Sequence, residues 1–262
     1  TADNDVFEIT WQGELRATDV ADLAPATLKS TNGILTASTL IQGKEGGEPI
    51  ISAARGWPAC GAFYQSRLWM GGLRSRPQTA LGSRLGDPFD FNIKGSTSAV
   101  GISIDLDTDQ VTTITAFFPG QHLQILTSAA EFFFPTEPIV APPAVKQATR
   151  RGVQPGTQQA EMDGATVFVT RGGQAVAEFL YDDSRQNYRA DHLSYLASHL
   201  VTDIVDMAFR SALSTTDTDR ALLTRASGEI TAMSALRAQE VTGFQRWTTD
   251  GRFLAGCSDL VG

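Results

Sequence analysis

The sequence has few cysteines, few charged residues and no long apolar run. Its two cysteines, Cys60 and Cys257, lie near opposite ends of the chain, so they do not form the closely spaced framework of a disulfide-rich domain. We expect two buried free thiols in a protein assembled in a reducing cytoplasm. No segment approaches the ~18 consecutive apolar residues that a membrane helix needs, so we expect no membrane partner.

The sequence also lacks the common catalytic and metal-binding motifs. It has no GxSxG nucleophile elbow, no GxxxxGK[ST] phosphate loop and no HExxH helix. Asp105, Asp107 and Asp109 have the spacing of a calcium loop, but Gln110 and Ala116 replace the required glycine and glutamate. We therefore predict a protein that is not an enzyme, with no catalytic residue, no cofactor and no metal ion.

The segment from Ala190 to Leu200 is the best helix candidate, because its leucines recur at helical spacing. His192 and His199 would share one face of that helix. Zinc sites on a helix use a spacing of about three to five residues and need a third ligand. We interpret both histidines as surface or packing residues.

The composition favours many short strands. The chain has 24 glycines and 11 prolines, and only 19% of its residues are charged. Its net charge is −8, whereas proteins that grip the phosphate backbone of DNA need a basic surface. An acidic wall would repel DNA and let it slide, although −8 is also ordinary for a soluble protein. Sequence-specific DNA binding is not expected.

Residues 57–91 have the pattern of one blade of a β-propeller. Phe63 to Met70 read as a hydrophobic strand, and Gly71-Gly72 ends it. Gln78 to Ser83 read as the return strand, and Gly86-Asp87-Pro88 supplies a turn before two phenylalanines. Both faces of the first strand carry bulky groups, which is typical of a strand inside stacked sheets.

A similar unit recurs along the chain. The strand centres before each glycine or small-residue break, Leu68, Leu123, Val167 and Leu222, are spaced by 55, 44 and 55 residues. Propeller blades repeat at ~40 to 50 residues. We therefore predict an all-β, propeller-like array of antiparallel blades over residues 57–262, with one short helix and at least three blades between Phe63 and Trp247.

Residues 1–56 form a less regular N-terminal region of strands and loops, with strands expected at 6–11 and 34–41. The chain begins with Thr1 instead of methionine, which suggests a processed product or part of a larger protein. Trp57, Trp69 and Trp247 are predicted to fill the space between blades. The sequence around Trp11 does not indicate whether it is a core residue, so Trp11 is the tryptophan on which a carbohydrate-binding surface is considered.

The run FYQSRLWMGG, followed by RPQTALGS and GDPFDFN, resembles a segment of phage tail nozzle proteins, also called tail tubular protein B. The resemblance continues through HLQILTSAAEFFF (His122 to Phe134), Phe168 to Tyr181, Ile204 to Met207 and Gln239 to Gly251. It covers residues 57–255 and rests on the order of the motifs. Residues 1–56 match more weakly, and members of the family are usually longer than this chain.

The resemblance implies a non-enzymatic structural protein of the virion, assembled in the host cytoplasm. It would form a ring of identical copies, with six as the expected number, beneath an adaptor ring and around the path of the exiting DNA. The alternative is a receptor- or carbohydrate-binding β-propeller at a tail tip. A propeller hydrolase is a weaker reading, because no converging carboxylates are found.

The segment from Phe132 to Gln147 is the predicted contact arm. It combines apolar side chains with four prolines, so it is too apolar for a free linker and too rich in proline for a central strand. Burial against its own propeller or against an adjacent subunit would both fit. We predict burial against an adjacent subunit, and the predicted interface residues are Phe132, Phe133, Phe134, Ile139 and Val140.

Overall fold

The computed structural model describes residues 50–258, except for residues 96, 213–216, 237–238 and 240. The chain divides into two units, Thr1–Gly56 and Trp57–Gly262. The strands expected at residues 6–11 and 34–41, and Trp11, lie outside the described residues. The second unit is all-β, as predicted.

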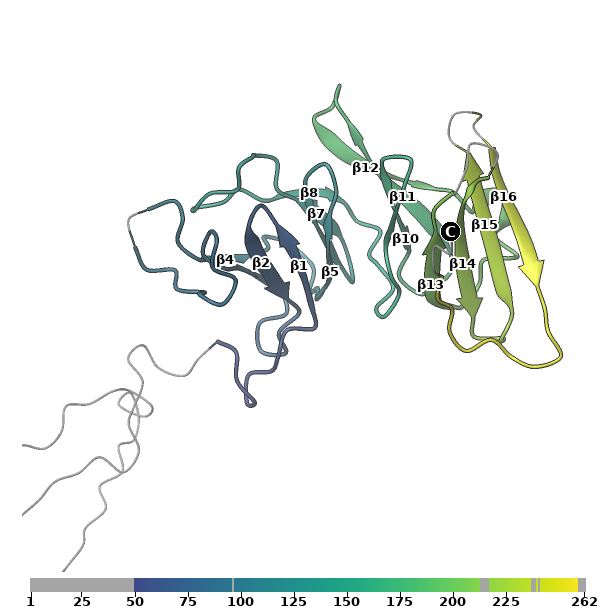
Figure 1. The fold of residues 1–262 in the computed structure, drawn as a ribbon, viewed down its shortest axis with the longest axis horizontal. Helices are drawn as coiled ribbons and strands as arrows, with labels where there is room; N and C mark the ends of the chain where they lie inside the picture. Colours follow the sequence, from purple (N-terminus) through teal and green to yellow (C-terminus); the bar gives the residue numbers. More distant parts are fainter. Residues whose placement is uncertain (1–49, 96, 213–216, 237–238, 240, 259–262) are drawn as a thin grey trace, which may run out of the picture. The chain divides into compact units, whose positions relative to one another are not determined.

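The described part of this unit forms four antiparallel sheets of four strands each (Figure 1). The first sheet comprises β1 (Cys60–Tyr64), β2 (Arg67–Gly71), β3 (Thr79–Gly82) and β4 (Ile102–Asp105). The second comprises β5 (Ile114–Pro119), β6 (Leu123–Thr127), β7 (Glu131–Phe133) and β8 (Lys146–Thr149). The third comprises β9 (Ala160–Met162), β10 (Ala165–Val169), β11 (Val176–Asp182) and β12 (Asn187–His192). The fourth comprises β13 (Ile204–Arg210), β14 (Asp219–Arg225), β15 (Ile230–Leu236) and β16 (Val241–Trp247).

Each sheet is built from consecutive strands in chain order, as a propeller blade is. The four recurring positions found in the sequence fall at equivalent places: Leu68 lies in β2, Leu123 in β6, Val167 in β10 and Leu222 in β14. Every one of these is the second strand of its sheet. The predicted repeat of antiparallel blades is therefore confirmed.

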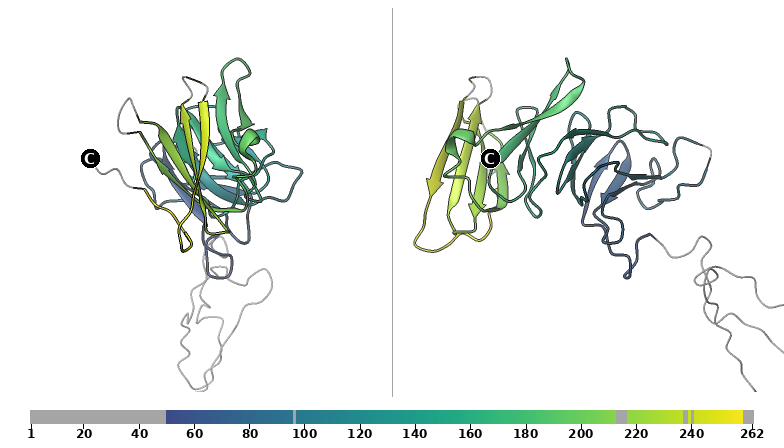
Figure 2. Two further views of the ribbon diagram at one scale, coloured as in Figure 1. Left: turned by 90° about the vertical axis from the view of Figure 1, so that its right-hand side faces the viewer. Right: turned by 180° about the vertical axis from the view of Figure 1, so that it is seen from behind.

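The sheets follow one another in the order of the chain (Figure 2). Apolar cores join each sheet to the next. Trp69 and Phe117 belong to the core between sheets one and two, and their ring centroids are 6.5 Å apart. Phe168 and Phe179 lie in the core between sheets two and three, and Met207 in the core between sheets three and four. Among the described residues, no core joins the first sheet to the fourth, so the blades stack in series and a closed propeller is not shown.

Strand β7 illustrates how one strand contributes to two cores. Because side chains alternate between the two faces of a strand, Phe132 points into the core with sheet one and Phe133 into the core with sheet three. The next residue, Phe134, returns to the first core. All three phenylalanines are at most 1% exposed. Sheets covered on both faces explain the runs of consecutive apolar residues in the sequence.

The first predicted strand is in fact a hairpin. Residues 63–70 were expected to be continuous, but Gln65 and Ser66 both have positive φ and form the tight turn between β1 and β2. Such turns usually contain glycine or asparagine, and neither residue stands here. The sequence therefore carried no recognisable signal for this turn.

The helix predicted at Ala190–Leu200 is wrong. Ala190 and His192 lie in β12, where they pair with Phe179 and Ala177 of β11. Only a three-residue 3-10 turn, Tyr195–Ala197, follows them. Pairing with β11 uses the first residues of the segment, and too few remain to form a stable helix. Over the described ranges, no helix is long and apolar enough to cross a membrane.

The segment after β16 contacts the fourth sheet at β13 and β14. After β16 the backbone returns, and the Gly256 N–H donates to Asp206 Oδ2 at 2.9 Å. A side chain at position 256 would lie in contact with Ala208 and Thr224 of the sheet. The C-terminal segment thus lies against Ala208, which is buried.

Candidate interaction surface

The predicted contact arm lies mostly inside the chain's own core. Phe132, Phe133, Phe134 and Ile139 are at most 4% exposed, whereas Val140 is 43% exposed. The expectation that the first four anchor a neighbouring subunit is therefore corrected. These four side chains pack in the cores between sheets one, two and three. Of the five residues, Val140 alone stays a predicted contact residue.

The tryptophans divide in the same way. Trp69 is fully buried between sheets one and two, as predicted, with its ring centroid 4.8 Å from that of Phe134. Trp57 is 69% exposed and Trp247 is 37% exposed, so neither fills a gap between blades. Trp57 precedes the first strand of the unit, and Trp247 ends the last one, where no further sheet covers it.

A buried arginine fixes the loop that links β3 to β4. The Arg67 guanidinium is 1% exposed and donates to the carbonyls of Ser83, Ser98 and Val100 at 2.5, 3.0 and 2.8 Å. Charged hydrogen bonds of this kind are stronger than neutral ones. They hold a loop that carries Phe89, which is 89% exposed. Sequence reasoning placed Arg67 only on a strand face and missed this anchoring role.

Glu131 is the most deeply buried carboxyl group among the described residues. Its Oε2 accepts hydrogen bonds from the Thr149 hydroxyl and, at 3.1 Å, from the Arg151 N–H. Its Oε1 has no hydrogen-bond partner in the described part of the chain. Burial raises the pKa of Glu131, and the hydrogen bonds only partly oppose this. The group lies within strand β7, so we interpret it as a structural residue.

Two of the aspartates whose spacing resembles a calcium loop have other partners in the described part of the chain. The Asp105 side chain accepts from Thr79, and Asp109 forms an ion pair with Arg150 at 3.0 Å. Where residues are described, no cluster of three or more histidine, cysteine, aspartate or glutamate side chains is placed to hold a metal ion.

The two cysteines are both free thiols, as expected, but the expectation that both are buried is wrong for Cys257. Burial raises the pKa of the Cys60 thiol to about 11, whereas Cys257 is exposed. A thiol with a raised pKa is a poor nucleophile at neutral pH, because the thiolate is the reactive form. Cys60 therefore has the character of a packing residue.

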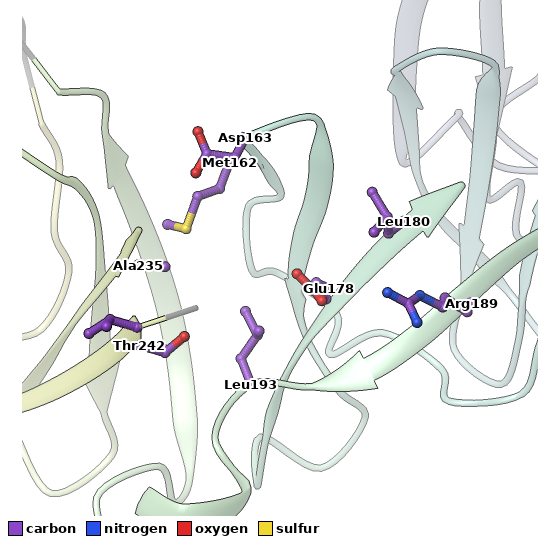
Figure 3. A pocket seen from close by; sticks show the side chains of 9 residues that line it. Met162, Asp163, Glu178, Leu180, Arg189, Leu193, Ala235 and Thr242 are labelled. Carbon is purple, nitrogen blue, oxygen red and sulfur yellow. The ribbon is translucent and has the colours of Figure 1, made fainter. Parts of the chain in front are cut away.

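A pocket of about 450 Å³ lies between the third and fourth sheets (Figure 3). Leu180 and Leu193 give it an apolar side on the third sheet and the segment after it, and Ala235 and Thr242 line it from the fourth. Arg189 also lines it and forms an ion pair with Asp191 at 3.2 Å. The remaining lining residues are Met162, Asp163, Glu178 and Val241.

Strand β16 is the most exposed strand of the described part. Six of its seven residues are exposed, and only Phe244 is partly buried, against the core between sheets three and four. The strand still pairs with β15 along its full length in a continuous register. An ordered strand that is mostly exposed and has one unpaired edge is a candidate contact surface. This surface was not predictable from the sequence, because the valine, phenylalanine and tryptophan of β16 resemble those of a core strand.

Neither a protein-family model nor a curated protein matches this chain.

Proposed function

We propose that this chain is a non-enzymatic structural component of a bacteriophage tail, positioned in the ring around the DNA exit channel. The main support is the array of four sheets in chain order. The sequence motifs that resemble tail nozzle proteins run through the same part of the chain, in the same order as in that family. An array with sheets covered on both faces is suited to a stiff wall, because close-packed cores resist deformation.

The charge of the chain supports the same proposal. A net charge of −8 disfavours tight binding of DNA and suits a surface along which DNA passes. In this proposal Glu131 and Cys60, whose pKa values are raised by burial, act as structural residues. In this proposal the chain works through contacts with its own copies and with adaptor or other tail proteins.

The proposal is tested by locating the chain in intact particles. A short epitope tag would be added after the C-terminal residue, and tagged particles would be imaged by electron microscopy with an antibody label. We expect label in a ring at the lower end of the tail. Label at fibre tips, or particles without label, would contradict the proposed position.

Receptor or carbohydrate binding is the second candidate, and the pocket between sheets three and four is the observation that favours it. An arginine, a carboxylate and leucine side chains can together bind the hydroxyl groups and apolar faces of a sugar. A glycan array would test this directly. Selective binding that is lost on Arg189→Ala would favour a receptor-binding protein over a wall component.

A further inference from the structure

Strand β16 ends its sheet with an edge that nothing in the described chain covers. The strand order of the fourth sheet is β13-β14-β15-β16, so β16 pairs on one side only (Figure 1). The outer strands of the second and third sheets differ from it. Strands β8 and β12 lie against each other, and Arg151 donates to the Ala190 carbonyl of β12 at 3.2 Å. In the described part of the chain, β15 is the only strand that pairs with β16.

The backbone groups at this edge follow from the hairpin between β14 and β15. Arg225 N–H donates to the Glu229 carbonyl at 2.9 Å, so this pair is hydrogen-bonded. Hydrogen-bonded pairs alternate along an antiparallel ladder. The odd-numbered residues of β15 therefore bond to β14, and the even-numbered ones bond to the odd-numbered residues of β16. Thr242, Phe244 and Arg246 consequently direct their N–H and C=O groups outward.

The edge lacks the features by which proteins usually block such strands. Natural edges are protected by proline, by charged side chains, by β-bulges or by short length. Strand β16 contains no proline, carries one charge, at Arg246, and pairs with β15 without a bulge. Bulges do occur in other pairs, such as β5 with β6 and β13 with β14. The uncovered edge is therefore regular and seven residues long.

We propose that β16 is an interface between two copies of this chain, in which the two β16 strands pair antiparallel across a two-fold axis. In the register centred on Phe244, Thr242 lies opposite Arg246 of the second copy, and Phe244 lies opposite its own equivalent. These are the outward-facing positions, so each such pair exchanges hydrogen bonds. The two fourth sheets become one continuous sheet.

The side chains of β16 are complementary to themselves in this register. Val241 meets Trp247 of the second copy at each end, in non-hydrogen-bonded pairs where side chains approach most closely. Val241 is 57% exposed and Trp247 is 37% exposed, so both have apolar surface to bury. Gly243 lies opposite Gln245, and a side chain at position 243 would meet no atom of its own chain within 4 Å. Arg246 faces threonine, so no like charges are opposed.

This contact goes beyond the proposed function and does not depend on it. A two-fold contact is isologous, whereas a ring around a channel needs a head-to-tail contact. The β16 interface is therefore an additional contact, which exists in the purified chain whether or not the chain is a tail protein.

Light scattering coupled to size exclusion tests the proposal across a series of protein concentrations. The wild-type chain should approach twice its mass of 28.1 kDa as the concentration rises. Thr242→Pro removes an outward N–H that no strand of the same chain uses, so this variant should stay at 28.1 kDa. Thr242→Val keeps the N–H and is the matched control, which should associate like the wild type. A wild-type chain that stays monomeric at every concentration would overturn the proposal.

A charge swap guards against a folding artefact. Thr242→Arg places arginine opposite Arg246 of the second copy at both ends, and it should weaken association at least tenfold. Adding Arg246→Thr restores an arginine-threonine pair at each end, so the double variant should associate like the wild type. Equal association of all three proteins would exclude this register, and loss of association in the double variant would do the same.

Discussion

Strands β7 and β16 carry similar side chains but occupy opposite environments. Strand β7 has two phenylalanines, and sheets one and three cover its two faces. Strand β16 has valine, phenylalanine and tryptophan, but it ends the last sheet and is mostly exposed. Hydrophobicity alone therefore does not distinguish a strand in the core from a strand on a contact surface. The number of sheets that pack against a strand determines whether its apolar side chains are buried or exposed.

The largest expected effect is at β7. Phe133→Ala should lower the free energy of unfolding by about 3–5 kcal/mol, because the fully buried ring would leave a cavity. Val241→Ala in β16 should change it by about 0.5 kcal/mol or less in the monomer. Urea unfolding of both variants measures the contrast. Similar losses would show that β7 and β16 are not in different environments.

Replacing both Phe133 and Phe134 with serine tests whether these side chains belong to the core or to an exposed contact arm. If these side chains formed an exposed arm, the variant would stay folded and lose only assembly. Since both are buried, we expect it to be largely unfolded at room temperature. Circular dichroism distinguishes the two outcomes.

The next effect concerns the arginine that anchors the loop between β3 and β4. Arg67→Met leaves three carbonyl acceptors without their donor and should cost about 3 kcal/mol. Arg84→Met is the control, because Arg84 forms only an exposed ion pair with Asp90, worth about 1 kcal/mol or less. Urea unfolding gives both values, and limited proteolysis of the loop should accelerate only in the Arg67 variant.

Proline replacements in β16 should have unequal effects on the monomer. Gln245→Pro removes an N–H that bonds to β15, and it should cost about 1–3 kcal/mol. Thr242→Pro removes an outward N–H and should cost less than about 1 kcal/mol. Thermal unfolding at low concentration compares them. Equal destabilisation would mean that the alternation of hydrogen-bonded pairs has been assigned incorrectly.

The smallest effect is a pH dependence from Glu131. Because burial raises its pKa in the folded state, the folded protein holds this proton more tightly than the unfolded chain does. Stability contributed by Glu131 is therefore greatest below its ordinary pKa of 4.5 and falls as the pH rises through the raised value. Glu131→Gln should remove this decline, and the exposed Glu161→Gln should not. Thermal unfolding from pH 4 to pH 8 checks it.

Much of the fold was predictable from the sequence, because glycine breaks and alternating apolar residues mark most hairpins. The recurrence of Leu68, Leu123, Val167 and Leu222 located the second strand of each sheet. The turn at Gln65-Ser66 was not predictable, because no glycine or asparagine signals its positive φ values. The helix expected at 190–200 failed because pairing with β11 outweighs a helical spacing of leucines.

The candidate surface was less predictable than the fold. Phe133 and Phe244 both belong to apolar strands, and the sequence does not say which strand ends the last sheet. Only the order of strands in the sheets shows that β7 is enclosed and that β16 has a free edge. The buried role of Arg67 likewise depends on carbonyls that are distant in the sequence.

Hydrogen exchange of backbone amides, measured residue by residue over a range of protein concentrations, tests the contrast between β7 and β16 most directly. We expect the Phe133 amide to exchange slowly at every concentration. The amides of Thr242, Phe244 and Arg246 should exchange fast in dilute protein and become protected as concentration rises. Slow exchange of these three amides in dilute protein would contradict the free edge of β16. Fast exchange at all concentrations would contradict its pairing with a second copy.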